Sequence, residues 1–322
     1  LQAFLRLLEA GEIREVLDAV GIFAGKLYAV GENWSRFLLD AVLEEENSYA
    51  VRYAKAGEVP DSISRCLVRE LAILERASRI RSEDIRQAVG HAGALPEWKV
   101  ETLSFLTAYQ SRMQEIPTKG YGIFAKYHTF IRTNGTLLPV RHPDPVRLSM
   151  LSGYEREREL VLQNTRALLQ GKPAANTLLY GDAGTGKSTT VKAVVNHYRD
   201  QGLRLIELKK EQLKEIPELM DELAENPLKF ILFIDDLSFT QNDGDFSALK
   251  AVLEGSVASR AHNVAVYATS NRRHLIRERF SDREGDEIHR GDTMQELVSL
   301  SDRFGLTVTF IRPDKQQYAD IV

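Results

Sequence analysis

Between residues 146 and 312 the chain alternates short apolar runs with helical stretches, and this pattern restricts the possible folds more than any other feature. The apolar runs lie at 177–180, 204–208, 230–234, 264–268 and 307–311, and the main helical stretches lie at 155–169, 187–199 and 246–258. Continuous apolar runs are typical of strands buried on both faces of a parallel sheet. We therefore expect an α/β domain over 146–312, with a five-stranded parallel sheet between helices.

The preceding 145 residues indicate a different architecture. Apolar residues recur there at helical spacing, which predicts a mainly helical N-terminal domain over 1–145. Near its end, Asn134 and Gly135 separate two runs of β-forming residues, and this predicts a β-hairpin near 122–141. The prolines between 139 and 145 then indicate a linker between the two domains.

Composition excludes several classes of protein. The chain has 322 residues, of which 43% are hydrophobic and 27% charged, as in ordinary globular proteins of two domains. Its net charge of −4 is unlike that of proteins dominated by contacts with a nucleic-acid backbone. The single cysteine, Cys66, cannot form an internal disulfide, which favours a reducing cytoplasm. No apolar run is long enough to span a membrane.

A glycine-rich motif separates the first apolar run from the helix after it. Residues 181–188 read Gly-Asp-Ala-Gly-Thr-Gly-Lys-Ser, which matches the phosphate-loop pattern G-x-x-x-x-G-K-[ST]. Glycines let successive backbone N–H groups turn toward one anion, and the helix N-terminus adds a positive dipole end. We expect Lys187 to reach the β- and γ-phosphates and Ser188 to bind Mg²⁺. The predicted nucleotide contacts here are Gly181, Asp182, Ala183, Gly184, Thr185, Gly186, Lys187, Ser188 and Thr189.

Two aspartates follow the apolar run at 230–234. Ligands of open α/β sheets bind at the carboxyl ends of the strands, which is where Asp235 and Asp236 belong. We expect Asp235 to hold Mg²⁺, directly or through water, and Asp236 to polarise the water that attacks the γ-phosphate. The alternative, a strand that merely ends in solvated aspartates, is disfavoured because a phosphate loop precedes the pair.

Polar residues also end the run at 264–268 and precede the last run. Asn271 is the candidate for a hydrogen bond to the γ-phosphate or the attacking water, since an amide adds no negative charge, and Thr269 is the alternative. Arg303 belongs to Ser-Asp-Arg-Phe-Gly. In an isolated chain it is a surface arginine paired with an acid such as Asp302, whereas in a ring it can reach the nucleotide of a neighbour.

Taken in order, GDAGTGKS, FILFIDD, ATSN and SDRFG resemble the motifs of the AAA+ ATPase superfamily. The segments 153–165 and 171–173, and FSALKAVLEGS at 246–256 with the ATSNRRHL that follows, resemble one bacterial family in particular. That family is domain-of-unknown-function family 815, whose members are described as predicted ATP-binding proteins.

This resemblance implies further expectations. The sheet order would be 5-1-4-3-2, with ATP and Mg²⁺ as cofactors, Asn271 as the sensor-1 residue and Arg303 as an arginine finger in a homo-oligomer. Tyr154 would lie near the adenine. The chain departs from the usual pattern in two ways: Asp236 stands where most relatives have Glu, and the helical lid is expected to be cut short at 313–322, so that no sensor-2 arginine is placed.

Three functions are compatible with these residues. The first is Mg²⁺-dependent ATP hydrolysis by an oligomeric, cytoplasmic AAA+ ATPase that remodels or switches an unknown protein client. The second is an ATP-dependent loader or scaffold with slow hydrolysis, which the Asp-Asp pair favours. The net charge of −4 and the absence of a DNA-reading motif count against nucleic acid as its partner. The third, a small-molecule phosphotransferase, gives no reason for the ordered ATSN and SDRFG motifs.

Overall fold

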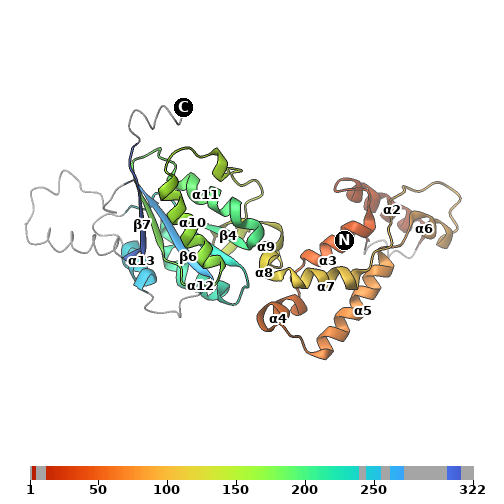
Figure 1. Cartoon of the computed structure of the whole chain (residues 1–322). Coiled ribbons are helices and arrows are strands. Elements are labelled where there is room, and N and C mark those ends of the chain that lie inside the picture. The colour runs from red at the N-terminus through yellow and green to blue at the C-terminus, as the bar shows by residue number, and fades with distance from the viewer. Residues whose placement is uncertain (1, 5–11, 239–243, 255–261, 272–302, 313–322) are drawn as a thin grey trace, which may run out of the picture. The chain divides into compact units, whose positions relative to one another are not determined.

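The computed structural model describes residues 2–4, 12–238, 244–254, 262–271 and 303–312 (Figure 1). The chain divides into two compact units, one formed by 1–116 with 121–123 and the other by 117–120 with 124–322. This division differs from the expected boundary at 145, because it assigns the hairpin region to the second unit. The expected lid residues, 313–322, lie outside the described residues. In the described ranges, no helix has the length and apolar character needed to cross a membrane.

The first unit contains helices packed around one apolar core. Its helices are α2 (Ile13–Tyr28), α3 (Trp34–Glu44), α4 (Ser48–Ala56), α5 (Asp61–Ala77), α6 (Ser82–Ala88) and α7 (Phe105–Gln114). Trp34 is fully buried; its ring lies 5.0 Å from that of Phe23, and its Nε1 donates to the Ala77 carbonyl at 3.0 Å. Asn33 caps α3 and Asn47 caps α4, because their side chains accept the first free backbone N–H groups of each helix.

The second unit is built on a sheet whose strands lie in the order β2-β1-β4-β5-β6-β3-β7. The strands are β1 (Thr129–Thr133), β2 (Thr136–Pro139), β3 (Thr177–Gly181), β4 (Leu203–Leu208), β5 (Lys229–Ile234), β6 (Val264–Ser270) and β7 (Leu306–Phe310). The helices are α10 (Glu155–Leu169), α11 (Lys187–Tyr198), α12 (Ile216–Ala224) and α13 (Gly244–Glu254), with 3-10 turns η1 (Leu148–Met150), η2 (Arg199–Gln201) and η3 (Lys210–Glu215). Short helices α8 (Ile116–Lys119) and α9 (Ile123–Lys126) occur where the chain passes between the units.

The expected five-stranded sheet is wrong in strand number and therefore in its full order. The hairpin β1–β2 joins the sheet, because β1 runs parallel to β4 with Thr129 opposite Leu205 and Ile131 opposite Glu207. The five strands of the α/β region alone lie in the order β7-β3-β6-β5-β4 within this sheet, which is the order expected for them. The Asn134-Gly135 pair turns the hairpin with positive φ angles of 49° and 75°.

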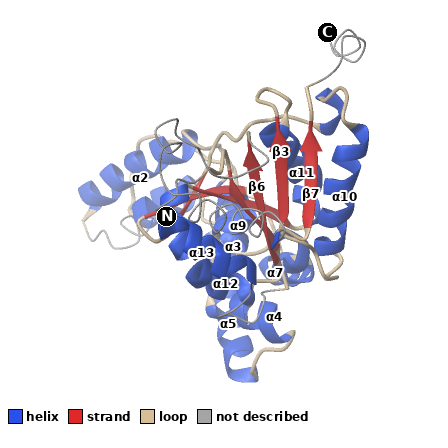
Figure 2. Ribbon diagram, turned by 90° about the vertical axis from the view of Figure 1, so that its left-hand side faces the viewer, coloured by secondary structure: helices blue, strands red, loops and turns tan. Residues whose placement is uncertain are grey.

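The inner strands β4, β5 and β6 are buried on both faces, as their continuous apolar runs predict, and helices cover the sheet (Figure 2). On one face, Phe230 and Leu232 pack in a cluster with apolar residues of η3, α12 and α13. On the other face, Ile231 and Phe233 pack in a cluster with residues of α10 and α11. Successive residues of β5 therefore pack against helices on opposite faces of the sheet. This packing leaves only the ends of the inner strands open to a ligand.

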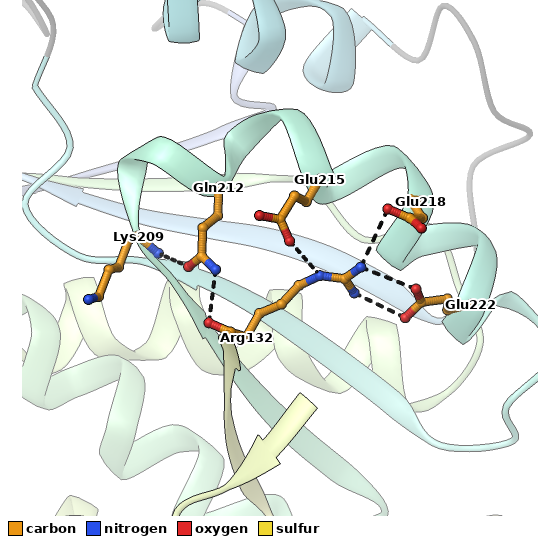
Figure 3. Close-up of polar contacts among 6 residues, drawn as sticks. All are labelled: Arg132, Lys209, Gln212, Glu215, Glu218 and Glu222. Atoms are coloured by element: carbon orange, nitrogen blue, oxygen red, sulfur yellow. Dashed lines mark hydrogen bonds and ion pairs between the residues drawn. The ribbon is translucent and has the colours of Figure 1, made fainter. Parts of the chain in front are cut away.

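Arg132 on β1 fixes the added hairpin to the helical layer (Figure 3). Its side chain is fully buried, and its guanidinium pairs with three glutamates of η3 and α12. Nε lies 2.7 Å from Glu215, Nη1 lies 3.0 Å from Glu222 and Nη2 lies 3.5 Å from Glu218. The strand backbone is held as well, because Gln212 Nε2 donates to the Arg132 carbonyl at 2.8 Å. The hairpin therefore cannot leave the sheet without breaking charge-assisted hydrogen bonds.

We expect Arg132→Ala to lower the free energy of unfolding by about 2–4 kcal/mol, because it removes these bonds and leaves carboxylates facing one another. Glu218→Ala is the matched control. That side chain is 72% exposed and its pair with Arg132 is long, so we expect a loss below about 1 kcal/mol. Urea unfolding followed by circular dichroism measures both values. Equal losses would contradict the role given to the buried guanidinium.

Candidate functional site

The phosphate-loop motif forms a tight turn between β3 and α11. Gly186, the residue before α11, has a φ of 82°, a left-handed conformation that glycine adopts without steric cost. Gly181, at the end of β3, has a φ of 139°, and a Cβ there would lie only 1.9 Å from the Phe310 carbonyl oxygen on β7. The Thr185 hydroxyl donates to the Asp182 carbonyl at 2.8 Å and closes the turn. The loop therefore holds backbone N–H groups and a helix N-terminus around one point.

Lys187 extends from the start of α11 back across this turn. Its ammonium donates to the carbonyls of Gly181 and Asp182 at 3.0 and 2.7 Å, and to Asn271 Oδ1 at 3.0 Å. Burial lowers the pKa of Lys187 below its usual value, while the carboxylates of Asp182, Asp236 and Asp235 act in the opposite direction. The amine thus lies between the loop and the end of β6, surrounded by acceptors.

Ser188 and Asp235 meet at the mouth of the turn. The Ser188 hydroxyl donates to Asp235 Oδ1 at 2.5 Å, and the Thr269 hydroxyl donates to the same oxygen at 2.5 Å. Thr269 also accepts the Asp236 N–H at 2.9 Å. Thr269, which the sequence suggested only as an alternative to Asn271, therefore orients both aspartates from the neighbouring strand.

Asp236 and Asn271 form the third contact across the strand ends. Asn271 Nδ2 donates to Asp236 Oδ1 at 2.9 Å, so one amide bridges Lys187 and Asp236. Asp236 has a φ of 52°, in the left-handed region where Asp and Asn are tolerated far better than Glu. This conformation gives a physical reason for aspartate at a position where the family resemblance led us to expect glutamate.

These groups line one cavity of about 350 Å³ at the carboxyl edge of the sheet. Its lining consists of residues 183–189 with Asp235, Asp236, Thr269 and Asn271. Residues predicted from three separate segments of sequence thus come together. Gly181 and Asp182, at the start of the loop, do not line the cavity and contact Lys187 through their carbonyls. The donor set suits a hard cation held between one hydroxyl and one carboxylate. No cluster of three or more His, Cys, Asp or Glu able to hold a metal alone occurs in the described part of the chain.

Tyr154 does not line this cavity. It precedes α10 with a φ of 58°, its hydroxyl donates to the Ile311 carbonyl at 2.7 Å, and its ring lies 5.2 Å from that of Phe310. Burial, and then the nearby Asp182, raise the pKa of Tyr154. Its contacts attach the start of α10 to the segment after β7.

Asp182 links the phosphate loop to the same segment. Its backbone N–H donates to the Phe310 carbonyl at 3.0 Å, and its carboxylate accepts the Arg312 N–H at 2.7 Å. Sequence reasoning missed this second role. The only available signal was the presence of an acid in a loop expected to bind phosphates.

Arg303 lies at the opposite end of the sheet. It lines a cavity of about 480 Å³ with residues 172–176, His262 and Gly305, which precede or begin strands β3, β6 and β7. A strand of five residues is about 16 Å long, so the guanidinium is separated from the phosphate loop of its own chain by the length of β3. The structure therefore does not bring Arg303 together with the other predicted site residues.

Comparison with known proteins gives one family and a distant structural likeness. Residues 123–322 match the family described as "Protein of unknown function (DUF815)". Among solved structures, the chain is similar to the Aeropyrum pernix ORC1 protein in complex with DNA, with 16% identity over 53% of this chain and a TM-score of 0.37. The match spans 48%, about half, of that chain. No curated protein matches this chain.

We expect Gly181→Ala to lower the free energy of unfolding by about 3–5 kcal/mol, because the added methyl combines left-handed backbone strain with overpacking against β7. Gly184→Ala is the control within the same loop: its φ is 78°, but an added Cβ meets no atom within 4 Å. We expect a loss of about 1–2 kcal/mol there. Thermal and urea unfolding measure both, and a smaller loss for Gly181→Ala than for Gly184→Ala would refute the close approach to β7.

Proposed function

This chain belongs to the DUF815 family of proteins of unknown function, and we propose that it binds ATP with Mg²⁺ and hydrolyses it as a P-loop ATPase of the AAA+ type. In this proposal, several copies of the chain assemble, and turnover remodels or switches a protein client. The observation that carries the proposal is the bridge formed by Asn271, which accepts from Lys187 at 3.0 Å and donates to Asp236 at 2.9 Å.

In this proposal the three residues joined by the bridge, Lys187, Asp236 and Asn271, have different roles. Lys187, at the N-terminus of α11, faces the position of the β- and γ-phosphates and stabilises their charge. Asp236 accepts a proton from the attacking water at its carboxylate. Asn271 orients that water, or the γ-phosphate, without adding negative charge. Asp236 and Asn271 follow the ends of neighbouring strands and Lys187 begins α11, so all three side chains are held by rigid elements around the place proposed for the reacting phosphate and water.

Ser188 and Asp235 are the residues that fit Mg²⁺. Both present oxygen atoms, which Mg²⁺ prefers, and a single protein carboxylate with substrate phosphates is its usual environment in nucleotide enzymes. Charge supports the assignment as well, because three carboxylates, Asp182, Asp235 and Asp236, act on the single ammonium of Lys187. A triphosphate entering this acidic site requires a cation with it, and Mg²⁺ when bound neutralises charge on the β- and γ-oxygens.

Arg303 is proposed to act on a neighbouring subunit. Its position at the end of the sheet opposite the phosphate loop supports this proposal, since Arg303 does not line the phosphate-loop cavity of its own chain. In an oligomer that brings this end of one chain against the phosphate loop of the next, the arginine stabilises negative charge in the transition state.

Contacts with the segment after β7 suggest how a change at the nucleotide could be transmitted to the client. Asp182 of the phosphate loop accepts the Arg312 N–H, and Tyr154 before α10 donates to the Ile311 carbonyl, each at 2.7 Å, so one hydrogen bond ties the segment after β7 to the loop and the other ties it to the start of α10. A shift of the loop on binding or release of phosphate therefore moves this segment.

We expect Asp236→Asn to lower the ATP turnover number at least about 100-fold, because it removes the base. Nucleotide affinity should change less than about threefold, since asparagine keeps the left-handed backbone and the side-chain shape. Release of inorganic phosphate and binding of a fluorescent ATP analogue measure the two quantities. Asp221→Asn, at an exposed position on α12, is the matched control and should keep wild-type turnover.

The same assay separates the competing functions. Unchanged turnover in Asp236→Asn contradicts the role of this carboxylate. Label that appears on an added acceptor rather than as free phosphate identifies a phosphotransferase. Tight Mg²⁺-dependent binding with almost no turnover in the wild type favours the loader or scaffold.

A mixing experiment tests Arg303. We expect the turnover per wild-type chain to rise with protein concentration, and an excess of Arg303→Ala protein to lower it, because mixed oligomers present sites without the arginine. Arg14→Ala, at an exposed position on α2, is the control and should leave the turnover per active chain unchanged. If turnover depends neither on protein concentration nor on added Arg303→Ala protein, Arg303 does not act on a neighbouring subunit.

A further inference from the structure

Another cavity, of about 1130 Å³ and larger than the two already described, lies in the second unit away from the phosphate loop. Its walls are the segment 141–149, the carboxyl-terminal end of α11 and His128 before β1. Asn196 on α11 builds this shape, because its Nδ2 donates to the carbonyls of Asp144 and Val146, both at 2.8 Å. These two hydrogen bonds hold the segment 141–149 against α11, and the cavity lies between them.

The lining of this cavity is strongly basic. Three arginines, Arg141, Arg147 and Arg199, contribute to it together with the histidines at 128, 142 and 197, and Asp144 is the acidic residue in the lining. Neither Arg141 nor Arg147 forms an ion pair with the described residues, and Arg199 has only a long pair with Asp200, at 3.7 Å. In a chain whose net charge is −4, this is a local concentration of positive charge in a concave surface, which focuses the field on an anion.

His128, just before β1, is partly buried in the wall of this cavity. Its Nε2 atom is buried and has no hydrogen-bond partner among the described residues. Burial, and then the nearby Arg199, lower the pKa of His128. Its backbone is fixed, because the His128 carbonyl accepts the Leu205 N–H at 2.9 Å.

We propose that this cavity binds a small molecule carrying two or more phosphate groups. Guanidinium groups hold phosphates with paired, parallel hydrogen bonds, and three of them line the hollow. The lining contains no Phe, Tyr or Trp on which the bases of a nucleic-acid strand would stack, and the hollow is concave and bounded by the segment 141–149. Both features favour a compact polyanion over a nucleic-acid strand. The proposal is independent of ATP hydrolysis, because it uses none of the residues at 181–189, 235–236 or 269–271.

Titration calorimetry with tripolyphosphate tests the proposal in the full chain carrying Lys187→Ala, which weakens the competing phosphate loop. We expect saturable binding of one equivalent at about 0.15 M salt. Adding Arg141→Ala and Arg147→Ala together should weaken it at least about tenfold, since each change removes a charge-assisted contact with the phosphates. Arg156→Ala, an exposed arginine on α10 outside the cavity, removes one positive charge, as Arg141→Ala or Arg147→Ala does singly, and should change the affinity less than about twofold.

Each other result counts against the proposal. Absence of saturable binding overturns it, and equal weakening by Arg156→Ala shows general charge attraction rather than a site. A single-stranded oligonucleotide that displaces tripolyphosphate and binds more tightly through Arg141 and Arg147 identifies a nucleic-acid surface instead. Circular dichroism of every variant confirms that the fold is intact. Loss of ATP turnover with this binding retained separates failure of the proposed ATPase from failure of this inference.

Discussion

The register of β3 with its two neighbours determines where each candidate site residue lies. Tyr180 is opposite Ser270 on β6, and Gly181 is opposite Phe310 on β7, so the phosphate loop, Asn271 and the segment after β7 all begin at one level of the sheet. The absence of a side chain at 181 permits this alignment, because the Phe310 carbonyl occupies the space of a Cβ. The same register leaves Arg303, which precedes β7, at the far end. The alignment of β3 with its neighbours therefore explains both the phosphate-loop cavity within one chain and the proposed action of Arg303 on a neighbouring chain.

The cavity at the phosphate loop and the cavity beside the end of α11 differ in the sign of their charge. The cavity at the strand ends carries Asp235 and Asp236 against Lys187, so an anion enters it favourably only with a cation. The cavity beside the end of α11 carries arginines and histidines against Asp144 and attracts an anion by itself. Chelation of divalent metal should thus affect phosphate binding in the first cavity and leave the second unaffected. This difference in metal dependence distinguishes the two sites more sharply than affinity does.

Sequence reasoning succeeded where local patterns determine the outcome. Strands buried on both faces need continuous apolar runs, and parallel strands bring their carboxyl ends to one edge, so Lys187, Asp236 and Asn271 were predictable neighbours. The pairing partner of the hairpin was not predictable, because Asn134-Gly135 specifies a turn but not the strand beside it. The ion pairs of Arg132 were not predictable either. In the sequence Arg132 resembles a surface arginine, and only the fold places it next to Glu215 and Glu222. The position of Tyr154 came from resemblance alone, and the structure shows it bonded to Ile311 rather than lining the cavity.

The left-handed backbone of Asp236 has a consequence for how sequences related to this one can vary. The turn after β5 is held by the Thr269 hydroxyl, which accepts the Asp236 N–H, and by the Asn271 amide, which holds the carboxylate. Glutamate at this position would resist the same φ and extend beyond the amide. A lineage that exchanges aspartate for glutamate here must therefore reshape the turn at the same time. The length of the acid at 236 is therefore coupled to the shape of the turn that Thr269 and Asn271 hold.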